Sequence, residues 1–505
     1  MVIVSYMNGP MMPGYQPKIP LPYPKADKWK ALSAAALGTL MATMDASITN
    51  ISFPVLTKVF TTNLAAVMWV TLAYTVVCTS MMLALGKISD LIGRKKIYTG
   101  GMAIFTLGLM ACSLAQSLSQ LILFRTLQAV GAAMSISCGP AIITAAFPPQ
   151  ERGKALGLLG ISVSLGFIIG PILGGFLLQL LNWRSIFYIR APVGLITILM
   201  AITFLREDRL EMGKTRLDIM GALTSSAGIF CIVFGVSQTN KVGLASPWVY
   251  ACMGLGLLSL IAFIFIERRA QDPVIDLTLF KNRVFSSAIW SLFLSFVAAP
   301  FYILIMPFYL MQGLGMTASS AGLLMAVNAV ITILVGPISG SLSDRFGPIY
   351  FSTIGAVATA AAFYCMRGFD LQTQITGIIP VLVLLGLGVG TFQPPNNSMI
   401  MGAVTKEHLG TASALIATQR QVGFSLGMAL TGTIFSARRT SYMEELASQG
   451  FDAGYAANLS IALAFQDVLL VSIFLALLVI IFCLFPGKSK AGPIENVKMG
   501  SGLHY

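Results

Sequence analysis

The chain has 505 residues, of which 56% are apolar and only 10% are Asp, Glu, Lys or Arg. Soluble domains usually carry about 25% charged residues, so this composition excludes an ordinary cytosolic enzyme. The net charge of +13 would suggest a nucleic-acid partner in a soluble protein. In a membrane protein the same excess is expected in cytoplasmic loops, so the positions of the charges decide its meaning.

Long apolar runs dominate the sequence. A helix needs about 20 mostly apolar residues to cross lipid hydrocarbon, and fourteen such runs predict an all-α integral membrane protein. The weakest division lies at 117–120; without it the count falls to thirteen. The predicted spans are 29–56, 64–85, 98–117, 119–145, 155–180, 185–205, 217–238, 247–266, 284–311, 318–340, 349–366, 375–402, 410–436 and 464–485.

The basic residues fit an even number of spans with both termini in the cytoplasm. In this orientation 23 of the 32 Lys and Arg residues fall in inner segments and seven in outer ones, with Arg190 at the outer start of span six counted among the seven. The other two, Arg125 and Arg420, fall within spans. Lys and Arg concentrate in cytoplasmic loops of membrane proteins. The excess charge is therefore a topology signal, and we expect no nucleic-acid partner.

The chain ends and the cysteines give further expectations. Residues 1–28 contain six prolines and no apolar region of the signal-peptide type, so we expect a cytoplasmic Pro-rich tail. We expect a second cytoplasmic tail at 486–505. All seven cysteines lie in predicted spans without a CxxC pair, so they are interpreted as core residues, neither metal ligands nor disulfides.

Two segments recur at a nearly constant spacing. The Gly, Ser, Asp and Gly of 86–93 recur in 340–347 at an offset of 254, and 165–170 resembles 422–427 at an offset of 257. These matches predict two repeated six-helix bundles, at 29–205 and 284–485, separated by an inserted helix pair and linker at 206–283. Repeated six-helix halves with a substrate site between them are typical of a large class of secondary transporters.

Four motifs follow one another in the first bundle, at 44–54, 86–96, 123–131 and 166–175. They are similar to the LDxTxxNxAxP pattern of span one, the GxxxDxxGRrk signature after span two, the span-four motif and the span-five antiporter motif. With them, residues 29–485 resemble the major facilitator superfamily, and more narrowly its fourteen-helix drug:proton antiporters. The resemblance implies proton-coupled efflux of lipophilic or cationic small molecules by alternating access, in the plasma or inner membrane.

One position departs from the family pattern. The start of span six usually reads WRWIFxINxPxG, whereas residues 183–194 carry Arg190 in place of the Asn. We expect Arg190 to add positive charge near the outer mouth. This charge weakens the inference that the substrate is a cation.

Two of the nineteen acidic residues fall at membrane depth, Asp45 and Asp467. A carboxylate at that depth is costly and is by default a functional candidate. We predict that Asp45 carries the coupling proton or binds a cation; the alternative is that it caps a local break or hydrogen-bonds Thr49. Asp467 is interpreted as an interfacial residue near the outer end of the last span.

The two arginines within spans need partners. Arg125 has no acid nearby in the sequence, so it must pair across the bundle or face water. The resemblance implies a role in proton transfer to or from the cavity, and a structural ion pair is the alternative. Arg420 lies between Gln419 and Gln421, and we interpret it either as lining the cavity or as an interhelical hydrogen-bond hub.

Glycine-rich motifs suggest moving and closely packed helices. Asp90 and Arg94 are four residues apart and can pair or cap a helix; the resemblance implies that this motif and its repeat hold an inner gate, whereas the plain alternative is a topology signal. The gating set is Gly86, Asp90, Gly93, Arg94, Asp344 and Arg345.

The small-xxx-small spacing in span five allows close helix approach, and the resemblance adds a bend that commits the cycle to exchange. The antiporter set is Gly166, Gly170, Pro171, Gly174 and Gly175.

The substrate-site candidates lie mainly in span twelve. We expect Pro394 and Pro395 to break this helix and Gln393, Asn396 and Asn397 to contribute polar groups to a cavity wall. Other residues could form a soft, adaptable pocket, although their helical spacing also suits the core. These are Phe301, Tyr302, Met306, Met325 and Asn328.

Other functions remain open at this point. The alternatives are proton-coupled transport of a physiological metabolite, for which Arg125, Arg190 and Arg420 favour an anion, and, more remotely, a non-transporting membrane receptor. An enzyme is not expected, because the two histidines, His408 and His504, have no nucleophile or acid cluster around them. No Walker loop is present. We expect a monomer whose partners are a small-molecule substrate, protons and the lipid bilayer, without ATP or a cofactor.

Overall fold

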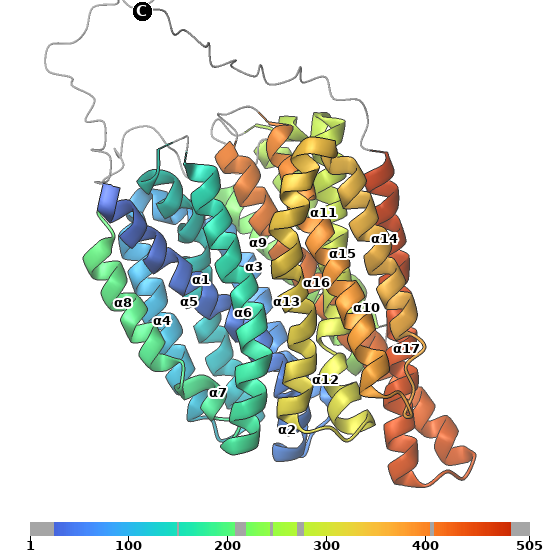
Figure 1. Ribbon diagram of the computed structural model, residues 1–505. Helices are drawn as coiled ribbons and strands as arrows, with labels where there is room; N and C mark the ends of the chain where they lie inside the picture. Colours follow the sequence, from blue (N-terminus) through green and yellow to red (C-terminus); the bar gives the residue numbers. More distant parts are fainter. Residues whose placement is uncertain are drawn as a thin grey trace, which may run out of the picture.

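The computed structural model describes residues 25–148, 151–207, 219–242, 246–269, 277–404 and 409–485, and every regular element within them is helical. The long helices run side by side, roughly along one direction (Figure 1). The predicted tails fall outside the described residues, except for 25–28, as do 208–218 and 270–276 of the predicted linker. An all-helical membrane fold, the predicted class, is confirmed.

The first half consists of six long helices and two short ones. The separation of spans three and four is confirmed, because α4 ends at Ser113 and Ser117 caps the next helix by accepting a hydrogen bond from the Gln120 N–H at 3.3 Å. The helices are α1 (Lys25–Ile51), α2 (Phe53–Val59), α3 (Leu64–Ile92), α4 (Arg94–Ser113), α5 (Leu118–Ala146), α6 (Arg152–Leu180), α7 (Ser185–Tyr188) and α8 (Ala191–Phe204).

The second half and the inserted pair account for the other elements. The inserted helices are α9 (Ile219–Val242) and α10 (Pro247–Glu267), followed by a 3₁₀ turn, η1 (Leu277–Lys281). The second half contains α11 (Arg283–Ile303), α12 (Met306–Phe308), a π-helical turn η2 (Tyr309–Gly313), α13 (Ala318–Phe346), α14 (Pro348–Met366), α15 (Ile375–Gly402), α16 (Leu409–Ser448) and α17 (Ala453–Leu484).

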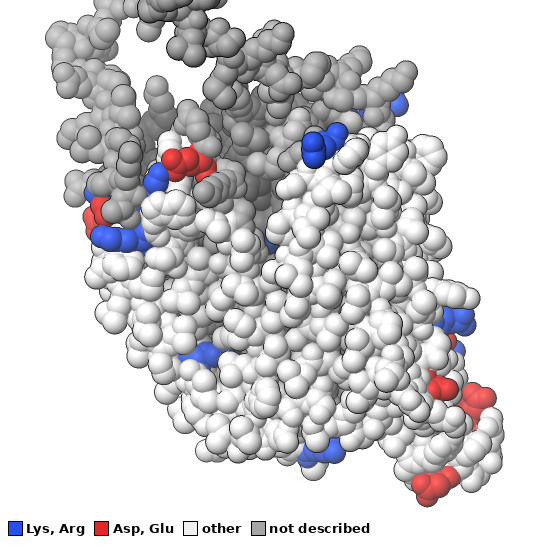
Figure 2. Space-filling view, in the orientation of Figure 1, with Lys and Arg blue, Asp and Glu red and all other residues white. Residues whose placement is uncertain are grey.

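Each of the fourteen predicted spans coincides with one helix or a short helix group. Ten helices in the described part are long and apolar enough to cross a membrane, and two shorter apolar helices lie at Ala66–Met82 and Leu223–Val236. Charged side chains are sparse over the middle of the face in Figure 2 and lie mostly toward its ends. This distribution matches a protein whose flank faces lipid.

Three expectations about the spans were wrong. Helix α15 runs unbroken through Pro394 and Pro395, because neighbouring groups in a bundle can satisfy the backbone that proline leaves unpaired. The segment expected as an outer loop at 437–463 is mostly helical, since α16 and α17 extend beyond the apolar runs as a hairpin (Figure 1, lower right). Cys365, expected in the core, is exposed.

Asp467, the acid expected at the outer interface, lies on α17 next to this hairpin. Its carboxylate accepts hydrogen bonds from Arg438 Nε at 2.5 Å and from the Tyr442 hydroxyl at 2.8 Å. The Asp467 side chain is 22% exposed. Asp467 therefore joins α16 to α17 at the edge of the bundle.

The two copies of the sequence repeat each end a helix in the same way. Gly93 and Gly347 end α3 and α13 with φ values of 109° and 98°, a conformation that favours glycine. Their N–H groups donate to the carbonyls of Ser89 and Ser343 at 3.0 and 2.8 Å. The same glycine cap at the corresponding position of α3 and α13 supports the interpretation of two related halves.

The inserted pair touches both halves through α9. This helix packs against α3 and α16 as well as α10. The Ser226 hydroxyl donates to the carbonyl of Ser80 on α3, and the Thr433 hydroxyl on α16 donates to the carbonyl of Val236 at 3.1 Å. The insertion is therefore tied to the two helices that face each other across the halves.

Candidate functional site

The two halves meet most closely where α6 crosses α13. A Cβ atom added at Gly175 would lie 2.4 Å from the carbonyl oxygen of Ala318, and one added at Gly322 would lie 2.2 Å from that of Pro171. Real Cβ atoms do not approach other atoms so closely, so only glycine fits at either position. The antiporter motif thus closes one end of the molecule against the second half.

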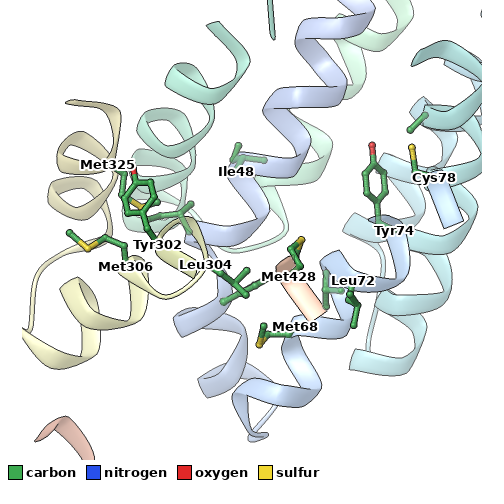
Figure 3. Close-up of a cluster of buried hydrophobic side chains, with 14 of the residues drawn as sticks. Ile48, Met68, Leu72, Tyr74, Cys78, Tyr302, Leu304, Met306, Met325 and Met428 are labelled. Carbon is green, nitrogen blue, oxygen red and sulfur yellow. The ribbon is translucent and has the colours of Figure 1, made fainter. Parts of the chain in front are cut away.

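An apolar cluster lies near this contact. Figure 3 shows Met68 and Leu72 of α3 near Leu304 and Met428 of the second half, with Ile48 of α1 farther along the same interface. All five side chains are buried. This cluster, together with the α6–α13 contact, seals one end of the interface between the halves.

The other glycines of the antiporter motif face α1. Cβ atoms at Gly166 and Gly170 would meet the Thr43 and Ser47 hydroxyls, and the Ser47 hydroxyl donates to the carbonyl of Gly166 at 3.0 Å. The motif therefore packs against two helices. Gly166, Gly170 and Gly174 allow the close approach of α1, whereas Pro171 and Gly175 lie at the close contact with α13.

A cavity of about 240 Å³ lies between the halves. Helices from both halves supply its wall, which is largely apolar and aromatic with a few hydroxyl and amide groups. Residues of the wall include Thr39, Ser47, Tyr74, Phe167 and Pro171 from the first half, and Phe296, Tyr302, Met325, Asn328, Gln393, Arg420 and Gln421 from the second.

Asp45 is fully buried beside this cavity but is not among the residues of its wall. Its two carboxylate oxygens accept hydrogen bonds from Arg125 Nη1 and Arg190 Nη1, both at 2.6 Å. Gln128 Nε2 donates to the same carboxylate at 3.0 Å. One carboxylate and two guanidiniums give this buried cluster a net charge of +1.

The expectation that Arg190 lies near the outer mouth was wrong. Arg190 is 1% exposed, and its Nε donates to the carbonyl of Ile186 at 2.6 Å. Residue 190 caps α8, and the side chain turns inward to Asp45 because that carboxylate offsets the cost of burying its charge. The alternative partner, Thr49, does not contact the Asp45 carboxylate: its hydroxyl donates to the backbone carbonyl of Asp45 at 2.8 Å.

Arg125 connects the cluster to the cavity. Its Nε donates to the carbonyl of Val70 at 3.1 Å and its guanidinium carbon lies 4.3 Å from the centre of the Tyr74 ring. Because Tyr74 lines the cavity, its ring separates Arg125 from the open space. The Tyr74 hydroxyl has no hydrogen-bond partner among the described residues.

Arg420 lies in the cavity wall, as one of its two interpretations expected. Neither an ion pair nor a hydrogen bond joins it to any other residue in the described part of the chain. Its neighbour Gln421 also lines the cavity. The hydrogen-bond-hub interpretation of Arg420 therefore finds no support in the arrangement of the described side chains.

The three span-twelve candidates have different surroundings. Gln393 lines the cavity. Asn396 is fully buried between helices, where its Nδ2 donates to the carbonyl of Ala288 at 2.9 Å and its Oδ1 accepts from the Ser291 hydroxyl at 2.9 Å. Asn397 is half-buried and is not among the residues of the wall.

The soft-pocket candidates divide in the same way. Tyr302, Met325 and Asn328 line the cavity, and Asn328 Nδ2 donates to the Tyr302 hydroxyl at 3.2 Å. Phe301 and Met306 are fully buried and lie outside the wall.

We expect Asn396→Ala to lower the free energy of unfolding by about 1–3 kcal/mol, because buried partners lose their hydrogen bonds. Gln393→Ala should leave stability nearly unchanged and alter substrate affinity. Thermal unfolding in detergent and the KM of transport separate the two effects. A Gln393→Ala protein with unchanged KM would remove Gln393 from the site.

The gating motif is described only in part. Arg94 Nη1 donates to the carbonyl of Ala141 on α5 at 3.2 Å, and Arg345 is exposed. The side chains of Asp90 and Asp344 lie outside the described part of the structure, although both residues belong to helices. An inner gate at these residues stays a prediction.

Sequence reasoning missed two parts of this site. Gln128 falls within the span-four motif, yet its bond to Asp45 had no local signal. Tyr74 was not selected, because an aromatic residue in an apolar run usually belongs to the core. The one signal in the sequence for this cluster was Arg190, an extra basic residue in a chain with a single acid near mid-span.

Paired helical bundles around a central cavity are the architecture of many secondary transporters of the membrane. Residues 35–428 match the family model of the Major Facilitator Superfamily, and the chain belongs to this family. The chain is 34% identical over 418 residues to the riboflavin transporter RibZ of Clostridioides difficile, covering 81% of this chain and 88% of that protein.

Other relatives carry names of a different kind. Identity to the multidrug resistance protein Stp of Mycobacterium tuberculosis is 30% over 421 residues, 82% of this chain and 77% of that protein. The tetracenomycin C resistance and export protein of Streptomyces glaucescens is 28% identical, over 81% of this chain and 76% of its own length.

The fold also matches solved structures. A bacterial homologue of the human lysosomal transporter Spinster, in an inward-facing and unoccupied conformation, superposes with a TM-score of 0.66. The alignment covers 93% of this chain and 100% of that one at 18% identity. This likeness confirms the transporter fold.

Proposed function

We propose that this protein is a proton-coupled secondary transporter that exports lipophilic small molecules by alternating access. The observation that carries the proposal is the mainly apolar cavity between two halves that are sealed together at one end. Relatives named for multidrug resistance and for export of tetracenomycin C support efflux. With both termini in the cytoplasm, the sealed end is the outer one.

We place the coupling proton on Asp45. Each carboxylate oxygen accepts a hydrogen bond from a guanidinium at 2.6 Å, so a proton taken up by the carboxyl removes the negative charge that holds both Arg125 and Arg190. Protonation and rearrangement of the cluster therefore occur together. Arg125 touches Tyr74 in the cavity wall, which gives that rearrangement a direct route to the bound substrate.

A second candidate is transport of a physiological metabolite. The relative that transports riboflavin supports it, as does Arg420, since a cavity for lipophilic cations does not need a guanidinium. Both candidates share the fold, the coupling and the cavity, and they differ in the substrate.

The test uses purified protein in liposomes with an imposed pH gradient. Riboflavin, a lipophilic cationic dye and an aromatic carboxylate are supplied in turn, with protein-free liposomes as the control. We expect movement of at least one of them to depend on the gradient and to stop when a protonophore is added. Movement that ignores the gradient would contradict proton coupling, and no movement of any of the three would contradict the proposed function.

A further inference from the structure

The wall of the cavity carries charge of one sign. Arg420 is the one charged residue among the described residues of the wall, and no carboxylate is among them. It has no ion-pair or hydrogen-bond partner in the described part of the chain. A guanidinium at membrane depth is costly unless water or an anionic group solvates it.

A second positive charge lies behind the same wall. Asp45, Arg125 and Arg190 together carry +1, and Arg125 is 4.3 Å from the centre of the Tyr74 ring. Tyr74 lines the cavity. Arg420 and the buried cluster thus both give the cavity a positive electrostatic potential. The low dielectric of the surroundings strengthens the attraction of this potential for a negatively charged ligand.

The rest of the wall suits a flat, apolar ligand body. Phe167, Phe296, Phe392 and Phe424 come from four different helices of the two halves. Aromatic side chains of this kind bind ring systems by stacking or edge contacts. Gln421, next to Arg420, adds an amide beside the guanidinium.

We propose that the substrate is an organic anion, an aromatic or other apolar body bearing one acidic group, and that Arg420 binds this group. The inference rests on the proposed transport function and names its substrate class. Arginine suits the task because its planar guanidinium forms paired, charge-assisted hydrogen bonds with a carboxylate. Arg420 is then the residue that selects anions over neutral and cationic molecules of the same shape.

The test compares ligands that share a naphthyl body and differ in the charge of their polar group. The probes are 1-naphthylacetate, its amide and 1-naphthylmethylamine, and their affinities for the full-length protein in detergent are measured by calorimetry. We expect the carboxylate to bind more tightly than the amide by about ten- to hundredfold, the usual range for a hydrogen-bonded charge, and the amine to bind least.

Three variants locate the effect. Arg420→Gln should remove the preference for the carboxylate, and Arg420→Lys should keep part of it. Arg439→Gln removes the same charge from the far end of α16, outside the wall, and should leave the preference intact. Thermal unfolding of each variant shows whether it is folded, and Arg420→Lys keeps the test valid if Arg420→Gln is not.

Equal affinity for the three probes, no binding of the carboxylate, or an anion preference that survives Arg420→Gln would overturn the inference. Gradient-driven transport of the amide or the amine but not of the carboxylate would also overturn it while leaving the proposed function standing. Absence of gradient-driven transport for every class would instead count against the function itself.

Discussion

Replacing Asp45 by Asn is expected to destabilise the protein by about 3–5 kcal/mol, the usual cost of removing one partner from a buried ion pair. The change leaves Arg125 and Arg190 facing each other across a neutral amide, without the carboxylate that each contacts at 2.6 Å. Thermal unfolding in detergent should show a clearly lower midpoint. Proton-driven transport should also be lost.

The matched comparison uses the residue that departs from the family pattern. Arg190→Asn restores the family residue and leaves a neutral Asp45–Arg125 pair, so it should cost less than Asp45→Asn. In the Arg190→Asn background, Asp45→Asn should also cost less, because only one guanidinium then loses its partner. An Asp45→Asn protein as stable as the wild type would show that the cluster does not hold the fold together.

The contact between α6 and α13 leaves no room for a methyl group at residue 175. Gly175→Ala is expected to slow transport by about five- to 150-fold, which corresponds to about 1–3 kcal/mol of overpacking against the sealed arrangement. The added methyl group would lie 2.4 Å from the carbonyl oxygen of Ala318. The initial rate in proteoliposomes measures the effect.

Helix α6 provides its own control for this substitution. A Cβ atom at Gly160 would have no neighbour within 4 Å, so Gly160→Ala brings the same gain in helix propensity without the collision. Equal transport rates for the two variants would show that the α6–α13 contact does not have to close during the cycle.

Local patterns in the sequence predicted most of the helices. Apolar runs identify segments that contact lipid, so the predicted spans coincide with helices, and the repeat at 86–93 and 340–347 marks equal caps in the two halves. The same criterion missed the hairpin at 437–463, because a helix in water needs no apolar run. The prolines of α15 led to the opposite error, a predicted break where the helix continues, since a bundle tolerates proline within a helix.

The site was harder to predict because its contacts join distant parts of the chain. Arg190 meets Asp45 across 145 positions, and its place at the start of span six made it look like a residue of the outer mouth. Gln393 and Asn396 are three residues apart, so helical spacing puts them on neighbouring faces. The packing of α11 decides that Asn396 bonds Ala288 and Ser291 whereas Gln393 lines the cavity.

Alternating access requires the two halves to separate at their sealed end in every transport cycle. The hydroxyl of Ser319 on α13 contacts the side-chain amide oxygen of Gln179 on α6; Gln179 is exposed and Ser319 is half-buried. Cysteines at these two positions, in a Cys365→Ser background, therefore provide a disulfide lock. We predict that oxidation stops transport and that a reductant restores it. Full transport by the oxidised, cross-linked protein would contradict alternating access between the halves.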